Sequence, residues 1–516
     1  MKRISQRAVS RSCPVLVALV LGVLLFTAVR LRHVSQIQWK SIIHAGLEDK
    51  QGLEKPNWVP GTASSPSDRP SLEPGTCSSE IESLRRPELS LSDNILYSRR
   101  CVRPVRGKVD RDAIANISRP LITSTTTVNL TSCLHADIEP CEPLTLHVPS
   151  PYPKIQYPHL IFGVATSYDR MHSSIPAFAH WLSGTGARLV GTIIDANDPN
   201  SDFNLTLLEE SFRHAGVLAT FNPPKLTRRI SHEKDDARPV PVEHHHFMLI
   251  RELLALSTPS TRWLGILDDD TFFPALYPLD QELHRYDASK PFWLGALSDD
   301  FDSVKLWGFM AFGGAGVFLS MPLARALEPH SETCIRDTTI NTGDGILRDC
   351  VYAHSRTKLT IVSGLYQHDF RGDASGFYES GVRPLSVHHW KSWYKEPVPE
   401  MAAVTDVCGD CFLQRWRLGK DTMLTNGYSI TLYPGKEGTK TVDFEKIEGT
   451  WLHPGHEYDF SYGPLRKKLT EGAEKKSYKL REAREGDGFF RQVYVYEGSK
   501  TVEGGMDEVV ELVWEL

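Results

Sequence analysis

Three consecutive carboxylates, Asp268, Asp269 and Asp270, are the residues in this sequence whose types and spacing most clearly suggest chemistry. They follow a short apolar run at 263–267, which predicts a buried strand, and open α/β sheets present ligand sites at the carboxyl ends of their strands. Adjacent carboxylates repel one another, and hard oxygen ligands suit Mg²⁺ or Mn²⁺. The triplet therefore predicts a divalent-metal site for a phosphate-bearing substrate. A solvated acidic surface is the alternative interpretation.

A fourth carboxylate, Asp344, stands between Gly343 and Gly345 at the predicted start of a helix. Flanked by glycines, it could face a cleft, where a carboxylate can act as a general base. An acidic residue at a helix amino terminus is also favoured by the helix dipole alone. The spacing leaves both interpretations open.

Histidines could complete a carboxylate metal site, because imidazole is a common metal ligand. His368 follows a strand-like run at 359–365, and His388 and His389 follow the short run P-L-S-V. Residues 244–246 are also histidines, but they open a predicted helix, on which adjacent positions point in different directions. The later histidines are therefore the candidate ligands.

The elements that must position these residues alternate between strands and helices. We predict buried strands at 159–167, 187–195 and 217–221. We predict helices at 174–181, 204–215 and 243–256. The alternation predicts a mainly parallel sheet with helices on both faces. Two glycine-bearing segments, 292–300 and 312–320, match neither a dinucleotide fingerprint nor a P-loop. Strand-like runs beyond residue 400 predict a β-rich region.

The amino terminus resembles a membrane anchor. Cations at 2, 3, 7 and 11 precede an apolar run at 13–29, and no clear cleavage site follows it. A signal-peptide core is the alternative to an uncleaved signal anchor. Cations before the span favour a cytosolic amino terminus, which gives a single-pass type II protein of the Golgi or ER membrane with a lumenal catalytic domain.

We accordingly expect five parts, which are a cytoplasmic tail at 1–12, the span at 13–29, a lumenal stem at 30–155, a catalytic domain at 156–400 and a β-rich carboxyl-terminal extension at 401–516. Eight of the nine cysteines follow the span, and an even number in an oxidising lumen predicts disulfides. Cys408 and Cys411 could instead form a zinc half-site or a redox pair, but a structural disulfide fits better because no second C-x-x-C exists. The net charge of −6 gives no indication of nucleic-acid binding.

The order of motifs resembles the fringe-like glycosyltransferases, which include fringe and the core-1 type β-1,3-galactosyltransferases. The motifs are T-S near residue 166, L-D-D-D-T-F, W-L-G-A-L-S, F-G-G-A-G-V-F-L-S, a G-D-G helix start and L-S-V-H-H-W. The chain is similar above all to uncharacterised fungal and plant fringe-like proteins, which share C-G-D-C-F-L-Q-R-W and T-N-G-Y-S-I. The resemblance covers roughly residues 155 to 435.

The resemblance implies a GT-A fold, which is a Rossmann-like α/β domain, and an inverting enzyme. It implies a nucleotide-sugar donor, usually a UDP-sugar, a glycan or glycoprotein acceptor, a β-1,3 linkage and dependence on Mn²⁺ or Mg²⁺. By motif, Asp270 resembles a direct metal ligand, and Asp268 faces the metal or the donor ribose. Asp344 resembles the catalytic base. The remaining donor contacts would be Thr166, Arg170 and Asp269.

One departure from the family pattern concerns the metal histidine. The uncharacterised relatives carry L-H-Q-x-D where this chain has Tyr366 in the second position. His388 or His389 is then the first choice for the ligand, and His368 the second. The acceptor contacts would be Gly314, which lets a sugar approach the backbone closely, and Trp307 and Trp390, whose faces suit sugar rings, although tryptophan is more often buried. A metal-dependent phosphohydrolase and a non-catalytic lumenal carbohydrate-binding protein are the alternative functions.

Overall fold

The computed structural model describes residues 79–132, 141–198, 203–233, 238–501 and 504–516. Its central feature is a seven-stranded sheet of order β11-β9-β10-β8-β5-β6-β7. β10 is antiparallel to both of its neighbours, and the other pairs are parallel. The α/β class and the mainly parallel sheet are therefore confirmed. The strands are β5 (Leu160–Thr166), β6 (Arg188–Ile193), β7 (Leu218–Asn222), β8 (Trp263–Leu267), β9 (Trp293–Gly295), β10 (Val317–Ser320) and β11 (Leu359–Ile361).

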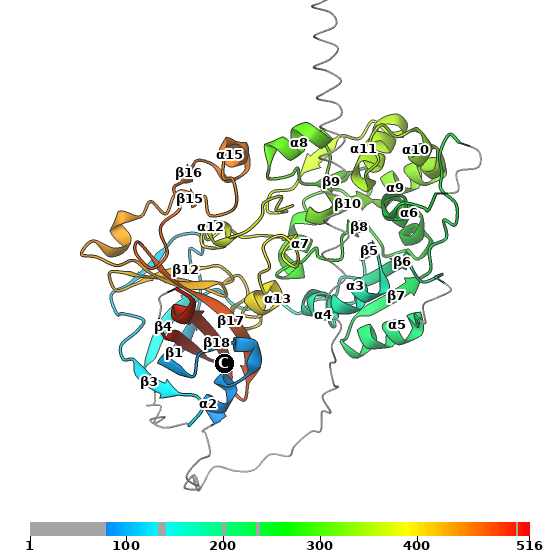
Figure 1. Ribbon diagram of the computed structural model, residues 1–516. Helices are drawn as coiled ribbons and strands as arrows, with labels where there is room; N and C mark the ends of the chain where they lie inside the picture. The colour runs from blue at the N-terminus through cyan, green and yellow to red at the C-terminus, as the bar shows by residue number, and fades with distance from the viewer. Residues whose placement is uncertain (1–78, 133–140, 199–202, 234–237, 502–503) are drawn as a thin grey trace, which may run out of the picture. The chain divides into compact units, whose positions relative to one another are not determined.

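Helices cover both faces of this sheet (Figure 1). Because strand side chains alternate between faces, Phe162 of β5 packs into one hydrophobic core and Ile161 into the other. Gly163 lets one helix approach closely, since a Cβ at that position would lie 2.9 Å from Leu253. The helices on the Ile161 face are α6 (Val242–Ala255), α9 (Met321–Leu327), α10 (Ser331–Asp337) and α11 (Gly343–His354). Those on the Phe162 face are α3 (Tyr168–Ser173), α4 (Ile175–Leu182), α5 (Leu205–His214) and α7 (Leu276–Leu283).

A second sheet of ten strands joins residues from the two ends of the described chain. Figure 1 shows β1 beside the carboxyl-terminal strands, and β1 pairs in parallel with β19 from Ile95–Asp507 to Val102–Trp514. The strands are β1 (Asn94–Arg106), β2 (Ala115–Ile117), β3 (Thr126–Asn129), β4 (Pro143–Val148), β12 (Arg415–Leu418), β13 (Thr422–Thr425), β14 (Ser429–Leu432), β17 (Lys476–Gly486), β18 (Phe489–Tyr496) and β19 (Asp507–Glu515).

This second sheet differs from the expected division into an irregular stem at 30–155 and a separate β-rich extension at 401–516. Residues 94–148 supply strands to the same sheet as the carboxyl-terminal residues. The pairing partner of β1 lies about 400 residues away along the chain, so no local pattern signals it. The strands predicted beyond residue 400 are confirmed.

The remaining elements are short, and β15 and β16 among them pair to form a separate two-stranded sheet. They are α2 (Ser79–Leu84), α8 (Phe301–Trp307), α12 (Ser375–Tyr378), α13 (Val398–Ala402), α14 (Thr405–Cys408), α15 (Asp459–Tyr462), α16 (Gly498–Thr501), β15 (Ile447–Glu448) and β16 (Leu465–Arg466).

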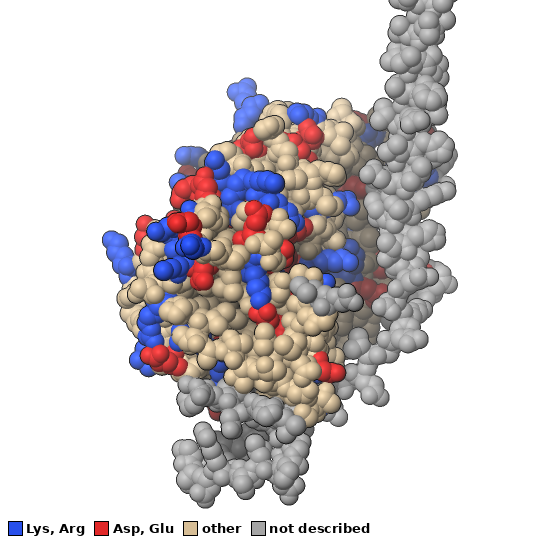
Figure 2. Space-filling model, turned by 60° about the vertical axis from the view of Figure 1, so that its left-hand side comes forward, with Lys and Arg blue, Asp and Glu red and all other residues tan. Residues whose placement is uncertain are grey.

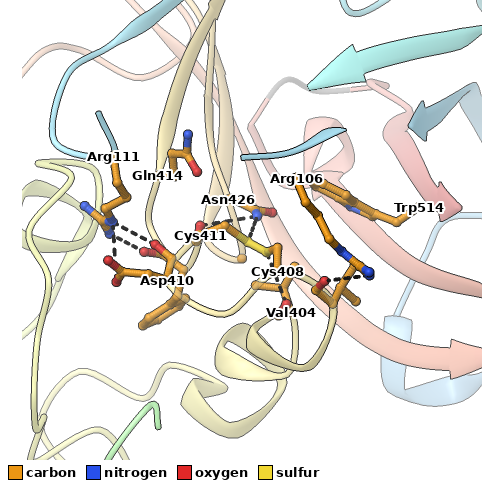
Figure 3. Close-up of a disulfide and its surroundings, with 12 residues drawn as sticks. Arg106, Arg111, Val404, Cys408, Asp410, Cys411, Gln414, Asn426 and Trp514 are labelled. Carbon is orange, nitrogen blue, oxygen red and sulfur yellow. Dashed lines mark hydrogen bonds and ion pairs between the residues drawn. A yellow bond between two sulfur atoms is a disulfide. The ribbon is translucent and has the colours of Figure 1, made fainter. Parts of the chain in front are cut away.

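Three disulfides are present among the described cysteines, which confirms the prediction of disulfide bonding. In Figure 3 the C-x-x-C pair is closed as a disulfide, with Asn426 Nδ2 donating to Cys411 Sγ at 3.0 Å. Arg111 Nε donates to the carbonyl oxygen of Asp410 at 3.0 Å in the same loop. The loop is therefore held both covalently and by hydrogen bonds. The pairs are Cys101–Cys141, Cys334–Cys350 and Cys408–Cys411, and Cys77 and Cys133 lie outside the described residues.

The predicted cytoplasmic tail at 1–12 and span at 13–29 also lie outside the described residues. Within the described ranges, no helix has both the length and the apolar character needed to cross a bilayer. On the face shown in Figure 2, Lys and Arg side chains are interspersed with Asp and Glu side chains. That face therefore presents no extended surface of a single charge.

Candidate active site

The three carboxylates behind β8 have different surroundings, and Asp269 is the most fully bound. Its side chain is 4 % exposed, and its Oδ2 accepts from Thr166 Oγ1 at 2.7 Å and from Arg170 Nε at 2.6 Å. The hydroxyl of Thr166 is thus used inside the protein, whereas the guanidinium of Arg170 stays 63 % exposed. Both carboxylate oxygens of Asp269 are bound by neighbouring side chains, so Asp269 orients Arg170 and is the least available of the three carboxylates for a metal.

Asp268 and Asp270 converge on a single imidazole. His388 Nε2 lies 3.0 Å from Asp270 Oδ1 and 3.3 Å from Asp268 Oδ2. Burial opposes ionisation of both carboxyls, yet contacts with His246 and His388 keep the pKa of Asp268 below its ordinary value, and contacts with His388 do the same for Asp270. The carbonyl oxygen of Gln367 lies 3.1 Å from Nδ1 of His388 and fixes its ring. Two carboxylates and an oriented imidazole fit the ligand set of a divalent cation.

Backbone pairing explains why His388 reaches these carboxylates. Phe272 and Val387 exchange two backbone hydrogen bonds of 2.9 Å, so the residue after Val387 comes alongside the triplet. His389 belongs to the same group of possible ligands as Asp270 and His388. Its Nε2, however, lies 3.3 Å from Asp369 Oδ1, and its ring stacks on another aromatic residue at 3.7 Å. The structure therefore favours His388 over His389.

Gly314 lies against His388. A Cβ added at Gly314 would overlap the imidazole ring of His388, so the missing side chain leaves room for the histidine. Gly314 was expected to let an acceptor sugar approach the backbone. The structure instead gives that space to His388.

We expect Gly314→Ala to displace the His388 ring and weaken Mn²⁺ binding, because the added methyl group and the ring cannot occupy the same space. Titration calorimetry should show roughly a 10-fold or greater loss of Mn²⁺ affinity, as for other changes that reorient a metal ligand. Gly107→Ala is the control, since a Cβ there meets nothing within 4 Å. Unchanged Mn²⁺ affinity in Gly314→Ala would show that His388 does not bind the metal.

Asp344 lies in the first turn of α11, and the helix is capped by Thr342 Oγ1, which accepts from the Gly345 amide at 3.0 Å. Asp344 Oδ2 accepts from the Gly313 amide at 2.9 Å, and its buried Oδ1 has no partner among the described residues. Burial raises the pKa of Asp344 to about 6, with the charge of Asp268 adding to the rise. Asp344 is therefore a buried carboxyl held by the Gly313 amide, in the first turn of the helix and within reach of the charge of Asp268.

His246 joins the same edge, and sequence reasoning did not select it. Its Nε2 lies 3.5 Å from Asp268 Oδ1. A Cβ at Gly313 would lie 2.7 Å from Asp344 Oδ1 and 3.3 Å from His246 Cε1, so the two side chains are neighbours. Of the three consecutive histidines, only this one faces the carboxylates, as expected for adjacent helix positions. The rotation of α6 about its axis relative to the sheet decides which of the three histidines faces the carboxylates, and the sequence does not show that rotation.

His368 does not reach the carboxylate site. Its side chain is buried among aromatic rings, with Phe377 at 4.2 Å and Tyr394 at 5.6 Å between centroids. The Tyr394 hydroxyl lies 2.9 Å from His368 Nδ1. Tyr366, the departure from the family pattern, belongs to the same aromatic cluster. That substitution therefore removes no ligand from the site around Asp268.

Asp299 accepts a hydrogen bond from the backbone amide of His368 in this aromatic cluster. We expect it to make the stability of the protein depend on pH. Burial and the charge of Asp369 raise the pKa of Asp299 to about 8, compared with about 3.9 in an unfolded chain. Between these values the unfolded chain has released the proton and the folded chain retains it, so stability falls as pH rises. Asp299→Asn keeps an acceptor for the His368 amide and should show a weaker decline of melting temperature from pH 5 to pH 9.

Thermal unfolding at several pH values checks this expectation. Asp302→Asn is the control because the Asp302 side chain is 66 % exposed. Equal pH slopes for wild type and Asp299→Asn would contradict a raised pKa at Asp299.

The two candidate tryptophans differ in exposure. Trp390 is 9 % exposed and packs against Phe272 at 6.1 Å, so it belongs to the core and offers no face to a sugar. Trp307, at the end of α8, is 39 % exposed. Its carbonyl oxygen accepts from Arg348 Nη1 at 3.0 Å, and Arg348 lies one helical turn after Asp344 on α11. Trp307 remains the acceptor candidate with available surface.

Part of the chain matches a protein-family model. The model, described as "Protein of unknown function, DUF604", covers residues 305–407, a segment that contains Asp344 and His388. No curated protein sequence matches the chain.

Several solved glycosyltransferase structures resemble parts of this chain. Mouse xyloside xylosyltransferase 1 matches at a TM-score of 0.27 and 10 % identity, over 40 % of this chain and 85 % of that one. The galactosyltransferase LgtC, in complex with donor and acceptor sugar analogs, matches at 0.28 and 12 %, over 48 % and 83 %. The glycosyltransferase GlyE of Streptococcus pneumoniae TIGR4 matches at 0.28 and 12 %, over 48 % and 60 %. TM-scores this low do not establish a shared fold. The chemistry of Asp268, Asp270, His388 and Asp344 is therefore the better guide to function.

Proposed function

We propose that this protein is an inverting, divalent-metal-dependent glycosyltransferase with a GT-A catalytic domain. It would transfer a sugar from a nucleotide-sugar donor, of the UDP-sugar class, to a hydroxyl group of a glycan or glycoprotein, with a β-1,3 linkage. The observation that carries the proposal is the convergence of two features at one sheet edge. A two-carboxylate and imidazole set lies there beside a separate buried carboxyl, Asp344, with a raised pKa.

Asp268, Asp270 and His388 would hold Mn²⁺ or Mg²⁺. Bound there, the cation supplies positive charge that stabilises a departing diphosphate. Asp268 and Asp270 remain ionised in their surroundings, as metal ligands must be. Asp269 is assigned to holding Arg170 toward the donor.

Asp344 would act as the general base. Its carboxylate takes the proton of the acceptor hydroxyl while the acceptor oxygen attacks the anomeric carbon. The bond between that carbon and the phosphate oxygen breaks on the opposite face, and its electron pair stays on the diphosphate. A pKa of about 6 leaves Asp344 ionised near neutral pH and makes it a stronger base than an ordinary aspartate.

The location in the Golgi or ER lumen, behind a type II anchor at 13–29, stays a proposal that rests on the sequence pattern. The three disulfides support an oxidising compartment.

A metal-dependent phosphohydrolase is the second candidate, because the same metal set could bind a simple phosphate ester. The proposed transferase additionally requires a base that receives the acceptor proton, and Asp344 provides it. A non-catalytic carbohydrate-binding protein is the third candidate, because Tyr366 departs from the family pattern. Tyr366, however, packs against Phe377 and His368 and not against Asp268 or Asp270.

The test uses the full chain with a panel of nucleotide sugars. A bound donor should raise the melting temperature with Mn²⁺ present and should lose that effect in EDTA, because only a folded-state ligand stabilises by mass action. Donor turnover should likewise require Mn²⁺ or Mg²⁺. Turnover of simple phosphate esters without nucleotide-sugar binding would favour the phosphohydrolase, and glycan binding without donor binding would favour a lectin.

A further inference from the structure

Lys391 is a half-buried cation without a carboxylate partner among the described residues. Its Nζ donates to Ser174 Oγ at 2.6 Å, and it forms no ion pair with any carboxylate that the structure describes. Lysine is seldom buried unless it is paired, because removing an ammonium group from water is unfavourable. Burial accordingly lowers the pKa of Lys391, while the more distant charges of Asp269 and Asp270 oppose the change. The position therefore holds a positive charge that the described residues leave without a close counter-ion.

Two segments of the chain hold Lys391 at the edge of the candidate active site. It lies three residues after His388, in the segment that pairs with Phe272. Its acceptor, Ser174 Oγ, lies 2.7 Å from the carbonyl oxygen of Arg170 and 3.1 Å from that of Asp269, and its single proton is shared between these two acceptors. One buried hydroxyl thus ties Lys391 to the two residues that form the neighbouring ion pair.

Arg170 supplies a second cation from the other segment. Its guanidinium is bound to Asp269 but remains 63 % exposed, so donor groups on its outer side stay available. The structure therefore links a planar guanidinium directly, and an ammonium through Ser174, to Asp269 in the loop after β8. Guanidinium binds phosphate through paired donors, and ammonium binds it as a point charge.

We propose that Lys391 and Arg170 form a clamp for the diphosphate of a nucleotide ligand. This inference rests on the proposed function and assigns its phosphate subsite. Asp268 and Asp270 together carry two negative charges, which a divalent cation would neutralise, so further positive charge is needed for a diphosphate. As the sugar–phosphate bond breaks, the electron pair moves onto the diphosphate, where the Lys391 ammonium and the Arg170 guanidinium can donate hydrogen bonds to it.

A structural role is the competing explanation, because Lys391 Nζ also lies 5.2 Å from the centre of the Trp390 ring. The two roles differ in what they affect. A phosphate contact contributes to UDP binding and leaves uridine and Mn²⁺ binding unchanged, whereas a packing contact alters all three or none.

The experiment is titration calorimetry of the full chain with Mn²⁺, UDP and uridine. Lys391→Met should weaken UDP binding on the order of 10- to 100-fold, as expected for loss of a charge-assisted hydrogen bond, and leave Mn²⁺ and uridine affinities unchanged. Lys391→Gln, which keeps the bond to Ser174 without the charge, should show the same selective loss and decides the question if Lys391→Met does not fold. Lys290→Met is the matched control, since Lys290 is 70 % exposed and pairs with Asp287 in the turn before β9.

The outcomes separate the clamp from the proposed function. Wild-type protein that does not bind UDP in the presence of Mn²⁺ contradicts the proposed function itself. Wild-type protein that binds UDP, together with variants that bind it equally well, overturns the clamp alone. Parallel loss of UDP, uridine and Mn²⁺ binding in both variants also overturns the clamp, because it shows that Lys391 supports packing.

Discussion

Asp344→Asn is expected to reduce glycosyl transfer by roughly 100- to 10,000-fold, the range that general-base catalysis contributes. The amide cannot accept the acceptor proton, although it nearly reproduces the shape of the carboxyl and can still accept from the Gly313 amide. Affinities for Mn²⁺ and for the donor should remain within about threefold of wild type, because Asp344 is not a proposed ligand of either. Steady-state turnover and titration calorimetry together measure these effects.

The pH dependence gives a second readout for the same residue. In wild type the base must be ionised, so turnover should rise as pH increases through about 6 and level off above it. The raised pKa also means that ionised Asp344 lowers metal-free stability as pH rises from about 3.9 to about 6. Asp344→Asn should therefore be at least as stable as wild type at pH 7, which excludes unfolding as the cause of lost activity.

Asp337→Asn is the control for Asp344→Asn, since the Asp337 side chain is 51 % exposed on the neighbouring helix. Wild-type turnover in Asp344→Asn would remove Asp344 as the base. Loss of Mn²⁺ affinity in that variant would instead place Asp344 among the metal ligands.

Asp270→Asn is expected to weaken Mn²⁺ binding by about 100-fold or more, because a direct ligand should matter at least as much as the outer residues that orient it. The buried Asp270 side chain faces His388, and the amide retains its size while losing its charge. Turnover at low Mn²⁺ should fall in proportion, and excess Mn²⁺ should restore part of it. Calorimetric titration with Mn²⁺ measures the affinity directly.

Asp269→Asn is the informative comparison, because it changes the adjacent carboxylate in the same way. Asp269 binds Arg170 and Thr166, so its substitution should raise the KM for the donor and leave Mn²⁺ affinity within about threefold of wild type. Equal losses of Mn²⁺ affinity in the two variants would show that the metal is not held by Asp268, Asp270 and His388. Activity that survives both Asp270→Asn and metal removal would exclude a metal-dependent reaction.

The elements that depend on neighbouring residues could be predicted from the sequence alone. The apolar run before Asp268 predicted β8, and the alternation of apolar and periodic segments predicted the mainly parallel sheet. Because the side chains of a buried strand need apolar surroundings wherever the strand lies, this part of the fold is visible in a short window. The carboxylates at the end of β8 are contiguous, so their clustering also required no knowledge of distant residues.

Which side chains join Asp268 and Asp270 depends on contacts between distant segments of the chain. His388 reaches them because Val387 pairs with Phe272, more than a hundred residues earlier, and because Gly314 leaves space for the ring. His368, the second choice, instead lies in an aromatic cluster, and His246 faces the site because of how α6 is rotated against the sheet. The pairing of β1 with β19 likewise joins segments that lie far apart in the sequence. These contacts depend on hydrogen bonds and steric fit between segments distant in the chain, and local residue patterns carry no record of which segments will meet.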